Sequence, residues 1–395
     1  MHILMYCDED LGIAAGGSRQ VLEFAKALIA RGHDVTVVAP ESEDPGPGIF
    51  VPPQIRLQLV PVIRWGGLRP VSFLLNSKRI LTRLLRDITP DVLLWFDSPG
   101  QLAPLWALEG KSCPTVYFVN GLPSEEVQGM WRLPPFRSLL SHGLRQAARN
   151  ANVIVSVCPE LFRSLKSLEP IDPGKCVVIK NGVDPVHFSP QPHHAARTEL
   201  SLVDQGPYIG FVGGFFPWHG LDTLVDAVAI VAKTHPTVQC LLVGEGQTTP
   251  ALKSQVDRLV LSRHVHFVGR TGFDSVPKWI AACDVCVVLH RQTRSYPGDS
   301  MKLWEYLACG RPVVATAGPG YGDVVVNFRC GLSVGAEDHD DLARQIMTLL
   351  DNPKLREKMG QRGRSAVVQT HTWAARAAQL EQVCHQAIGR TALAA

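Results

Sequence analysis

Short apolar runs alternate with amphipathic stretches along most of this chain. An apolar run of about four to eight residues is typical of a strand buried on both faces, whereas apolar residues spaced three and four apart indicate a helix. Their alternation predicts the α/β class, in which helices cover both faces of parallel sheets. The strands predicted for the first half are His2–Cys7, Val35–Ala39, Val92–Phe96, Val116–Val119, Val153–Val157 and Val177–Ile179.

The same pattern starts again after a polar passage rich in Pro and His, from Asp184 to Gly206. A chain of 395 residues also exceeds what one hydrophobic core normally supports. We therefore expect two doubly wound domains, 1–195 and 196–372, followed by a helix in 373–395 that either caps the second domain or packs back on the first. The strands predicted for the second half are Tyr208–Val212, Val238–Val243, Val265–Val268, Val285–Leu289 and Pro312–Ala315.

Both predicted domains open with a strand, a glycine pair and an amphipathic helix. The pairs are Gly16-Gly17 and Gly213-Gly214. Neither completes the Gly-x-Gly-x-x-Gly fingerprint, so a nicotinamide dehydrogenase is not favoured. Each pair still offers main-chain amides at a helix N-terminus. Because ligands of doubly wound sheets bind beyond the carboxyl ends of the strands, two such domains facing each other would enclose a cleft.

A helix predicted after Gly298-Asp299-Ser300 carries Lys302 and Glu305 on one face. A helix N-terminus and a lysine attract phosphates, and a carboxylate can accept two hydrogen bonds from a ribose diol. The pattern therefore suits a nucleoside diphosphate. The alternative is an ordinary surface ion pair, which is common at this spacing.

The amino-acid composition limits the classes of binding partner and of metal site that the chain can be expected to have. Hydrophobic residues make up 46% of the chain and charged residues 19%, with a formal net charge of +3, so neither nucleic acid binding nor acidic disorder is indicated. Ten cysteines are spread through apolar runs, as is typical of reduced, buried thiols. The close pair Cys283 and Cys286 would point to opposite faces of a strand, which disfavours a shared zinc. The acidic run from Asp8 to Asp10 lacks metal-ligand spacing, so no metal site is predicted.

The sequence shows no secretory signal and no apolar run near the roughly 20 residues that a membrane helix needs. We expect a cytoplasmic protein. Two basic amphipathic segments, 69–86 and 131–149, allow either peripheral contact with the inner face of a membrane or packing on the sheet with a basic outer face.

The motifs in order resemble the retaining, nucleotide-sugar-dependent glycosyltransferases of the GT-B fold, over nearly the whole chain. Each motif alone is weak, but their order and spacing together are specific. The resemblance implies two Rossmann-like domains across a cleft, a nucleotide-sugar donor, a hydroxyl acceptor such as a lipid-linked sugar, a glycan or a small metabolite, and neither metal nor cofactor. The matching motifs include Gly16-Gly17-Ser18-Arg19, Asn181-Gly182-Val183-Asp184, His219-Gly220-Leu221-Asp222, Gly244-Glu245-Gly246, and Glu305 through Gly310-Arg311-Pro312 to Ala315.

The resemblance also implies roles for single residues. The helix glutamate before the Gly-x-Pro-Val-Val turn binds the donor ribose, which corresponds to Glu305. The first glycine loop lies against the diphosphate and the acceptor, and the Gly213 loop approaches the phosphates. The donor-binding set expected in this way is Gly16, Gly17, Gly213, Gly214, Gly244, Arg270, Asp299, Ser300, Met301, Lys302, Leu303 and Glu305.

This chain departs from the family pattern at four positions. The first glutamate of Glu-x7-Glu is Pro297, with Asp299 nearby, and the usual arginine and lysine of the second glycine loop are Gly214 and His219. A histidine that often faces the reacting sugar corresponds to Asn120. An amide cannot act as a base, which suits a mechanism in which the leaving phosphate takes the acceptor proton.

Lys302, His219 and Asn120 are accordingly the catalytic candidates. We expect Lys302 to replace part of the lost positive charge, helped by His219 and the helix N-terminus. The predicted function is transfer of a sugar from a nucleotide-diphosphate donor to a hydroxyl acceptor with retention, in glycolipid, polysaccharide or metabolite biosynthesis. The departures leave two alternatives open, a nucleotide-sugar-binding scaffold without turnover and a sugar-nucleotide epimerase.

Overall fold

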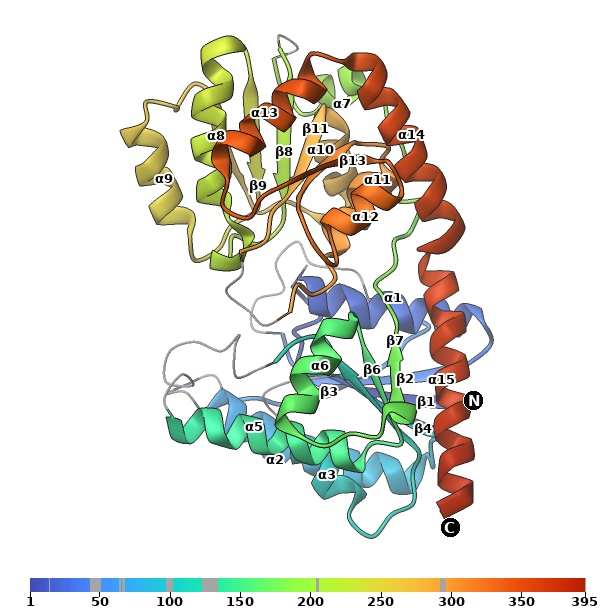
Figure 1. The fold of residues 1–395 in the computed structure, drawn as a ribbon. Coiled ribbons are helices and arrows are strands. Elements are labelled where there is room, and N and C mark those ends of the chain that lie inside the picture. The colour runs from blue at the N-terminus through green and yellow to red at the C-terminus, as the bar shows by residue number, and fades with distance from the viewer. Residues whose placement is uncertain are drawn as a thin grey trace. The chain divides into compact units, whose positions relative to one another are not determined.

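The computed structural model describes residues 1–13, 15–42, 51–63, 65, 68–96, 102–122, 134–203, 206–291 and 296–394. The chain forms two compact units (Figure 1). The first unit comprises Met1–Lys180 and Trp373–Ala395, and the second comprises Asn181–Thr372. Each unit is built on one parallel sheet with helices on both faces, which confirms the predicted fold class.

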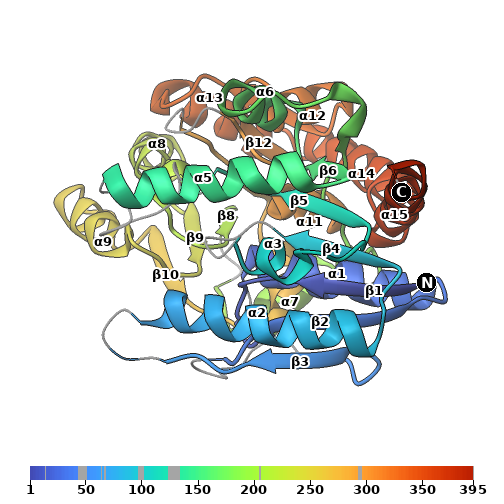
Figure 2. The same ribbon diagram turned by 90° about the horizontal axis from the view of Figure 1, so that it is seen from below.

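The first unit has a seven-stranded sheet in the order β3-β2-β1-β4-β5-β6-β7. Its central strands are completely buried, as expected for continuous apolar runs between two helix layers. Helices α2, α3 and α5 pack together on one side, and α1 and α15 on the other (Figures 1 and 2). The strands are β1 His2–Tyr6, β2 Asp34–Pro40, β3 Arg56–Val60, β4 Val92–Phe96, β5 Thr115–Val119, β6 Val153–Ser156 and β7 Cys176–Val178; the helices are α1 Gly16–Ala30, α2 Arg69–Asp87, α3 Leu102–Leu108, α5 Pro134–Asn150, α6 Pro159–Leu168 and α15 Trp373–Ala394.

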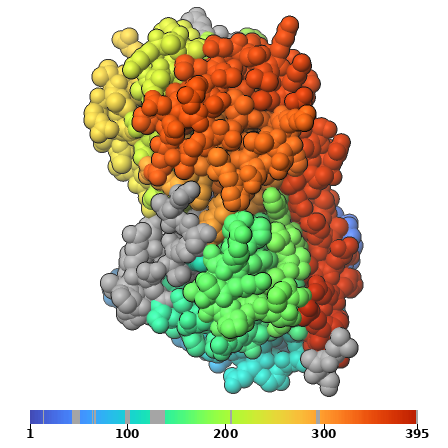
Figure 3. Space-filling model, in the orientation of Figure 1, coloured from blue at the N-terminus to red at the C-terminus, as the bar shows by residue number. Residues whose placement is uncertain are grey.

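The C-terminal helix α15 packs on the first unit. The Trp373 ring meets Phe24 of α1 edge-on, with centroids 5.1 Å apart. Further along, Glu381 accepts hydrogen bonds from Arg31 Nε at 2.8 Å and pairs with His33 Nε2 at 2.9 Å. The outer face of α15 forms part of the surface of this unit (Figure 3). Of the two alternatives for this helix, the structure shows the return to the first unit.

The second unit has a six-stranded sheet in the order β10-β9-β8-β11-β12-β13. One apolar cluster lies between the sheet and helices α8 and α13, and a second lies between the other face and helices α10 and α11. The strands are β8 Tyr208–Val212, β9 Gln239–Val243, β10 Val265–Gly269, β11 Val285–Val288, β12 Val313–Thr316 and β13 Gly331–Val334; the helices are α7 His193–Glu199, α8 Leu221–Thr234, α9 Thr249–Arg258, α10 Val276–Ala282, α11 Met301–Ala308, α12 Gly322–Asn327, α13 His339–Leu350 and α14 Pro353–Thr370.

The second unit begins at Asn181, earlier than the division near residue 195 that the polar passage suggested. The reason is local packing. Val183 pairs with Thr372 as an isolated bridge, and Phe188 is completely buried in the apolar cluster beside α11. Arg364 of α14 donates to the Phe188 carbonyl at 2.7 Å. A polar composition thus conceals contacts that tie this stretch to the second sheet.

Candidate functional site

The second sheet reverses its winding direction between β8 and β11. These strands are neighbours, yet the helix that follows β8 covers one face of the sheet and the helix that follows β11 covers the other. In doubly wound sheets, ligands bind beyond the carboxyl ends of the strands at such a switch point. The residues that follow β8 and β11 therefore form the candidate site.

Two basic side chains meet at this point. Lys302 lies in the first turn of α11, and His219 ends the short 3-10 helix Pro217–His219 after β8. Lys302 Nζ is 3.2 Å from His219 Nε2, although the residues are 83 positions apart. Both side chains are half-buried. The structure thus brings together two of the three catalytic candidates.

The main chain fixes the orientation of the imidazole. His219 Nδ1 lies 2.6 Å from the carbonyl oxygen of Gly214, which can only accept a hydrogen bond. Nδ1 must therefore carry the proton. In a neutral ring Nε2 then accepts, and its partner is the Lys302 ammonium. His219 consequently holds the lysine in place at the carboxyl end of β8.

Aromatic rings surround this pair. Lys302 Nζ lies 5.3 Å from the centroid of the Phe211 ring, close enough for a cation–π interaction. Phe216 and Trp218 stack on each other with centroids 4.7 Å apart, and both rings lie within about 6 Å of the imidazole. Apolar walls lower the local dielectric, so the ammonium acts more strongly on a nearby anion than it would in water.

Glycines create the space for this arrangement. Gly213 has a φ of 145°, and a Cβ built there would lie 2.9 Å from Lys302 Cε. Gly244, at the end of β9, has a φ of 124° and would overlap the Gly213 carbonyl if it carried a side chain. The loops after β8 and β9 therefore present bare main chain, which a phosphate can approach closely.

Helix α11 presents Glu305 one turn after Lys302, on the same side of the helix. The Glu305 side chain is buried, with 4% of its surface exposed. The next residue, Tyr306, fixes the helix against β8, because its hydroxyl accepts from Val212 N at 2.7 Å and donates to Val212 O at 3.2 Å. Burial raises the pKa of this phenol well above its usual value, so the hydroxyl keeps its proton.

The other predicted residues of the second unit differ in their placement. Ser300 is the N-cap of α11 and Met301 its first residue, both half-buried. Leu303 is completely buried in the apolar cluster, so only its main chain can face a ligand. Arg270 is exposed and follows the edge strand β10. The Asp299 carboxylate accepts hydrogen bonds from the Asn181 amide and the Trp304 indole.

Three candidates belong to the first unit. Gly16 and Gly17 open α1 as predicted. A Cβ on Gly17 would overlap the Glu9 carboxylate, so the chain's own acid lies against the first turn of this helix, where a negative charge is favourable. Asn120 exchanges two hydrogen bonds with Gln20, of 3.1 and 2.6 Å. Gln20 is almost fully buried and thereby fixes the orientation of the Asn120 amide.

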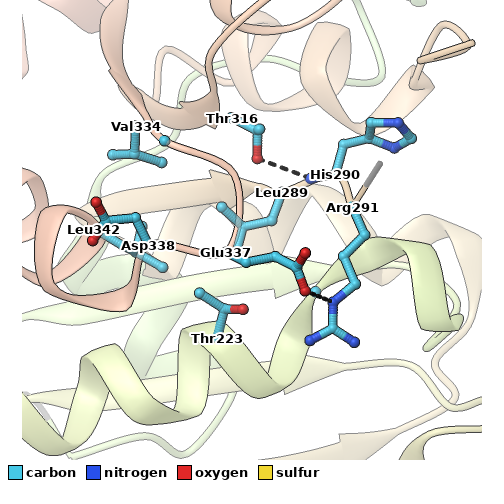
Figure 4. Close-up of a pocket in the computed structure, with 11 residues that line it drawn as sticks. Thr223, Leu289, His290, Arg291, Thr316, Val334, Glu337, Asp338 and Leu342 are labelled. Carbon is cyan, nitrogen blue, oxygen red and sulfur yellow. Dashed lines mark hydrogen bonds and ion pairs between the residues drawn. The ribbon is translucent and has the colours of Figure 1, made fainter. Parts of the chain in front are cut away.

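A small hollow opens at the carboxyl ends of β11, β12 and β13, on the side of α8 and α13 (Figure 4). Arg291 projects beside it and pairs with Glu337 at 2.7 Å and with Asp222. Thr316 Oγ1 accepts from the amide of His290 at 2.9 Å. Because two carboxylates already neutralise Arg291, the one arginine among the described residues that line this hollow, Arg291 is not available to bind a phosphate here.

Sequence reasoning missed the residues that assemble the site. Phe211 beneath the lysine and Tyr306 between α11 and β8 were not singled out. One signal was available: an aromatic run from Phe215 to Trp218 directly follows the glycine pair. Aromatic rings next to a predicted phosphate-binding loop are expected to pack against residues of the site. The contact of Tyr306 with Val212 had no such signal, because it depends on which strands are neighbours in the sheet.

No group of three or more His, Cys, Asp or Glu side chains with metal-binding geometry occurs among the residues that the structure describes. Within the same residues, no helix is long and apolar enough to cross a membrane. The cysteines at described positions are all free thiols, and burial raises the pKa of several of them, Cys309 to about 12.

Comparison with known proteins agrees with the fold. Residues 14–187 match the family described as Glycosyltransferase Family 4, and residues 194–366 match Glycosyl transferases group 1. A Corynebacterium glutamicum relative, the GDP-mannose-dependent monoacylated alpha-(1-6)-phosphatidylinositol monomannoside mannosyltransferase, is 28% identical over 79% of this chain and 80% of its own length.

Two solved structures share the fold over almost their whole length. Sucrose-phosphate synthase from Thermosynechococcus elongatus superposes with a TM-score of 0.81 at 21% identity, covering 98% of this chain and 99% of that one. Anabaena HepE in complex with UDP and glucose gives a TM-score of 0.75 at 19% identity, covering 96% and 98%. This chain therefore belongs to the retaining GT-B glycosyltransferases that combine a Family 4 domain with a group 1 domain.

Proposed function

We propose that this glycosyltransferase transfers mannose from GDP-mannose to a hydroxyl group of an inositol glycolipid. The Corynebacterium relative is named for this donor and for a phosphatidylinositol mannoside acceptor. The HepE structure contains UDP, so a UDP-hexose is the donor to compare first. The proposal concerns the donor and the acceptor, since the family already supplies the type of reaction.

The structural observation that supports a nucleotide-diphosphate donor is the contact between Lys302 and His219 at the switch point. Cleavage of the bond between sugar and diphosphate builds negative charge on the leaving group. An ammonium held half-buried beside aromatic rings stabilises that charge, and so do the amides at the start of α11. Glu305, on the same helix, is proposed to accept hydrogen bonds from the donor ribose.

Retention of configuration follows if the acceptor attacks from the side on which the diphosphate leaves. The oxygen of the departing phosphate then takes the proton of the acceptor hydroxyl as the new glycosidic bond forms. No protein base is required for this step. The Asn120 amide, which Gln20 already orients, is proposed to position a sugar hydroxyl through what remains of its hydrogen-bonding capacity.

The first unit carries a surface that suits a lipid acceptor. Apolar side chains are exposed on β3, on the segment after it and on the start of α2, and the basic residues Lys78, Arg79, Arg83 and Arg86 are exposed further along the same helix. Exposed apolar groups beside cations favour binding to an anionic membrane surface. The exposed apolar residues are Leu57, Leu59, Ile63, Trp65, Leu68, Val71 and Leu75.

A thermal-shift comparison of GDP, UDP, ADP and dTDP tests the donor. A ligand at about 100 times its dissociation constant adds roughly 2.7 kcal/mol to the free energy of unfolding, so the preferred nucleotide should stand out. We expect GDP to give the largest shift. Mannose transfer to vesicles that contain phosphatidylinositol mannoside should then depend on GDP-mannose. Sugar conversion without any acceptor would instead indicate an epimerase, and binding without turnover would indicate a scaffold.

Vesicle flotation tests the lipid surface. We expect the protein to float with vesicles that contain anionic lipid and not with neutral ones. The double variant Val71→Ser, Leu75→Ser should reduce flotation severalfold, because both side chains are more than half exposed and would lose their contact with the acyl region. Val186→Ser is the control, since Val186 is an isolated exposed valine of the second unit. Equal flotation of all proteins, or flotation of none, would contradict the proposal.

A further inference from the structure

The segment just before α11 is tied to a distant part of the chain through Asp299. Its Oδ2 atom accepts a hydrogen bond from the main-chain amide of Asn181 at 2.5 Å. Its own carbonyl accepts from Asn181 Nδ2 at 2.8 Å. The two residues, 118 positions apart, therefore hold each other by both side chain and main chain.

Trp304 adds a second connection from within α11. Its indole Nε1 lies 3.3 Å from each oxygen of the Asp299 carboxylate. Trp304 is completely buried. One face of its indole stacks on the His371 ring, with centroids 3.9 Å apart. Trp304 stands between Lys302 and Glu305 on α11, so the contacts that fix its indole also help to fix this stretch of the helix.

The partners of these residues lie where the chain passes between the two units. Asn181 is the first residue of the second unit, and His371 immediately precedes its last residue, Thr372. Val183 also donates to the carbonyl of His371 at 2.8 Å. At both points where the chain passes from one unit to the other, residues of the second unit thus contact the start of α11.

We propose that Asp299 is a positioning residue that fixes the first turn of α11, and with it the Lys302 ammonium, rather than a ligand of the donor sugar. This inference rests on the proposed function. Its basis is that the carboxylate is already engaged by a main-chain amide and an indole. Turning it toward sugar hydroxyls would give up both bonds and leave a buried indole N–H without its acceptor.

The two roles predict different binding patterns. A ligand of the donor sugar matters only when the sugar is present, so its loss would weaken GDP-mannose and leave GDP unchanged. A residue that positions Lys302 matters to the phosphates, which both molecules carry. Its loss should weaken both to the same extent, by roughly tenfold, because small misplacements of a charged group are costly.

Isothermal titration of the 395-residue chain with GDP, GDP-mannose, UDP and UDP-glucose separates these outcomes. We expect Asp299→Asn to raise the dissociation constants of a nucleoside diphosphate and of the corresponding nucleotide sugar equally. Trp304→Phe keeps the stacked ring but removes the indole donor, so it should reproduce the effect in milder form. Asp323→Asn is the matched control, because it removes an exposed carboxylate at the start of α12.

A selective loss of nucleotide-sugar binding in Asp299→Asn would overturn the inference, and so would a diphosphate affinity within twofold of wild type. If Asp299→Asn does not fold, Asn181→Ala, which removes the Nδ2 donor and keeps the main-chain amide, gives the same comparison. Wild-type protein that binds none of the four molecules would overturn the proposed function and this inference with it. Wild-type binding with an unaffected Asp299→Asn variant overturns the inference alone.

Discussion

Replacing Lys302 with methionine should slow sugar transfer by about 100- to 1,000-fold. Methionine keeps most of the length of the lysine and removes its charge. The ammonium lies 3.2 Å from His219 and over the Phe211 ring, in a half-buried position. At an effective dielectric constant of about 20, a unit charge about 4 Å away interacts with it by about 4 kcal/mol. Loss of one stabilising donor in other enzymes costs about 2.7–4 kcal/mol, so the two figures agree.

The assay measures release of GDP from GDP-mannose in the presence of acceptor vesicles. Comparing kcat with the affinity for GDP shows where the charge acts. A fall in kcat larger than the fall in GDP affinity means that the ammonium stabilises the charge that develops as the bond breaks. Equal losses would mean that it binds the ground state and the transition state alike.

The chain offers a matched control. Lys253 of α9 also lies over a phenylalanine, with Nζ 5.7 Å from the centroid of Phe267, but it is exposed and outside the candidate site. Lys253→Met should leave kcat unchanged. A Lys302→Met enzyme that folds normally and works within tenfold of wild type would refute the reasoning, because the Lys302 ammonium would then contribute little to the transition state.

Two further changes test the packing around Lys302 and the stability of the second unit. Gly213→Ala should lower the free energy of unfolding by about 1–3 kcal/mol and also reduce turnover, because φ is 145° there and the new Cβ would lie 2.9 Å from Lys302 Cε; urea unfolding and GDP release measure the two effects, and unchanged turnover would contradict the packing argument. Burial and the neighbouring Arg311 hold the pKa of His193 at about 4, so the unfolded chain, with a pKa near 6.5, takes up the proton first and stability should fall as the pH drops from about 6.5 to about 4. The loss should be on the order of 1–2 kcal/mol after allowance for solvent screening, and urea titrations of His193→Asn should show a flatter profile over this range; an identical profile would exclude His193 as the source.

The sequence predicted the buried strands well because a strand between two helix layers must be apolar throughout. Val92–Phe96 and Tyr208–Val212 have the same bounds in the structure as in the prediction. The two strands that were not predicted lie at sheet edges. In β3 the side chains of Leu57 and Leu59 are exposed, and β13 begins at Gly331, whose missing side chain lets it approach the Val313 carbonyl closely. These two edge strands therefore lack the continuous apolar run by which the other strands were found.

The candidate site was predictable only in part. Lys302 and Glu305 could be found because helical spacing is local. The contacts that position their helix join residues that are far apart in the sequence, such as Asp299 with Asn181 and Val212 with Tyr306. Spacing along the chain contains no information on which loops become neighbours. That information lies in the strand order, which places β8 beside β11.

Two of the four departures from the family pattern, Gly214 and His219, are connected in the structure. At Gly214, where the family resemblance implies an arginine, a Cβ would lie 2.5 Å from Phe216 Cε2, and that ring is stacked on Trp218. An arginine restored at this position would have to displace the aromatic pair. His219, in place of a lysine, is bonded to the carbonyl of the same Gly214 and holds Lys302. Both substitutions therefore have a structural counterpart, which is consistent with the proposal that an ammonium group and bare main chain bind the diphosphate here.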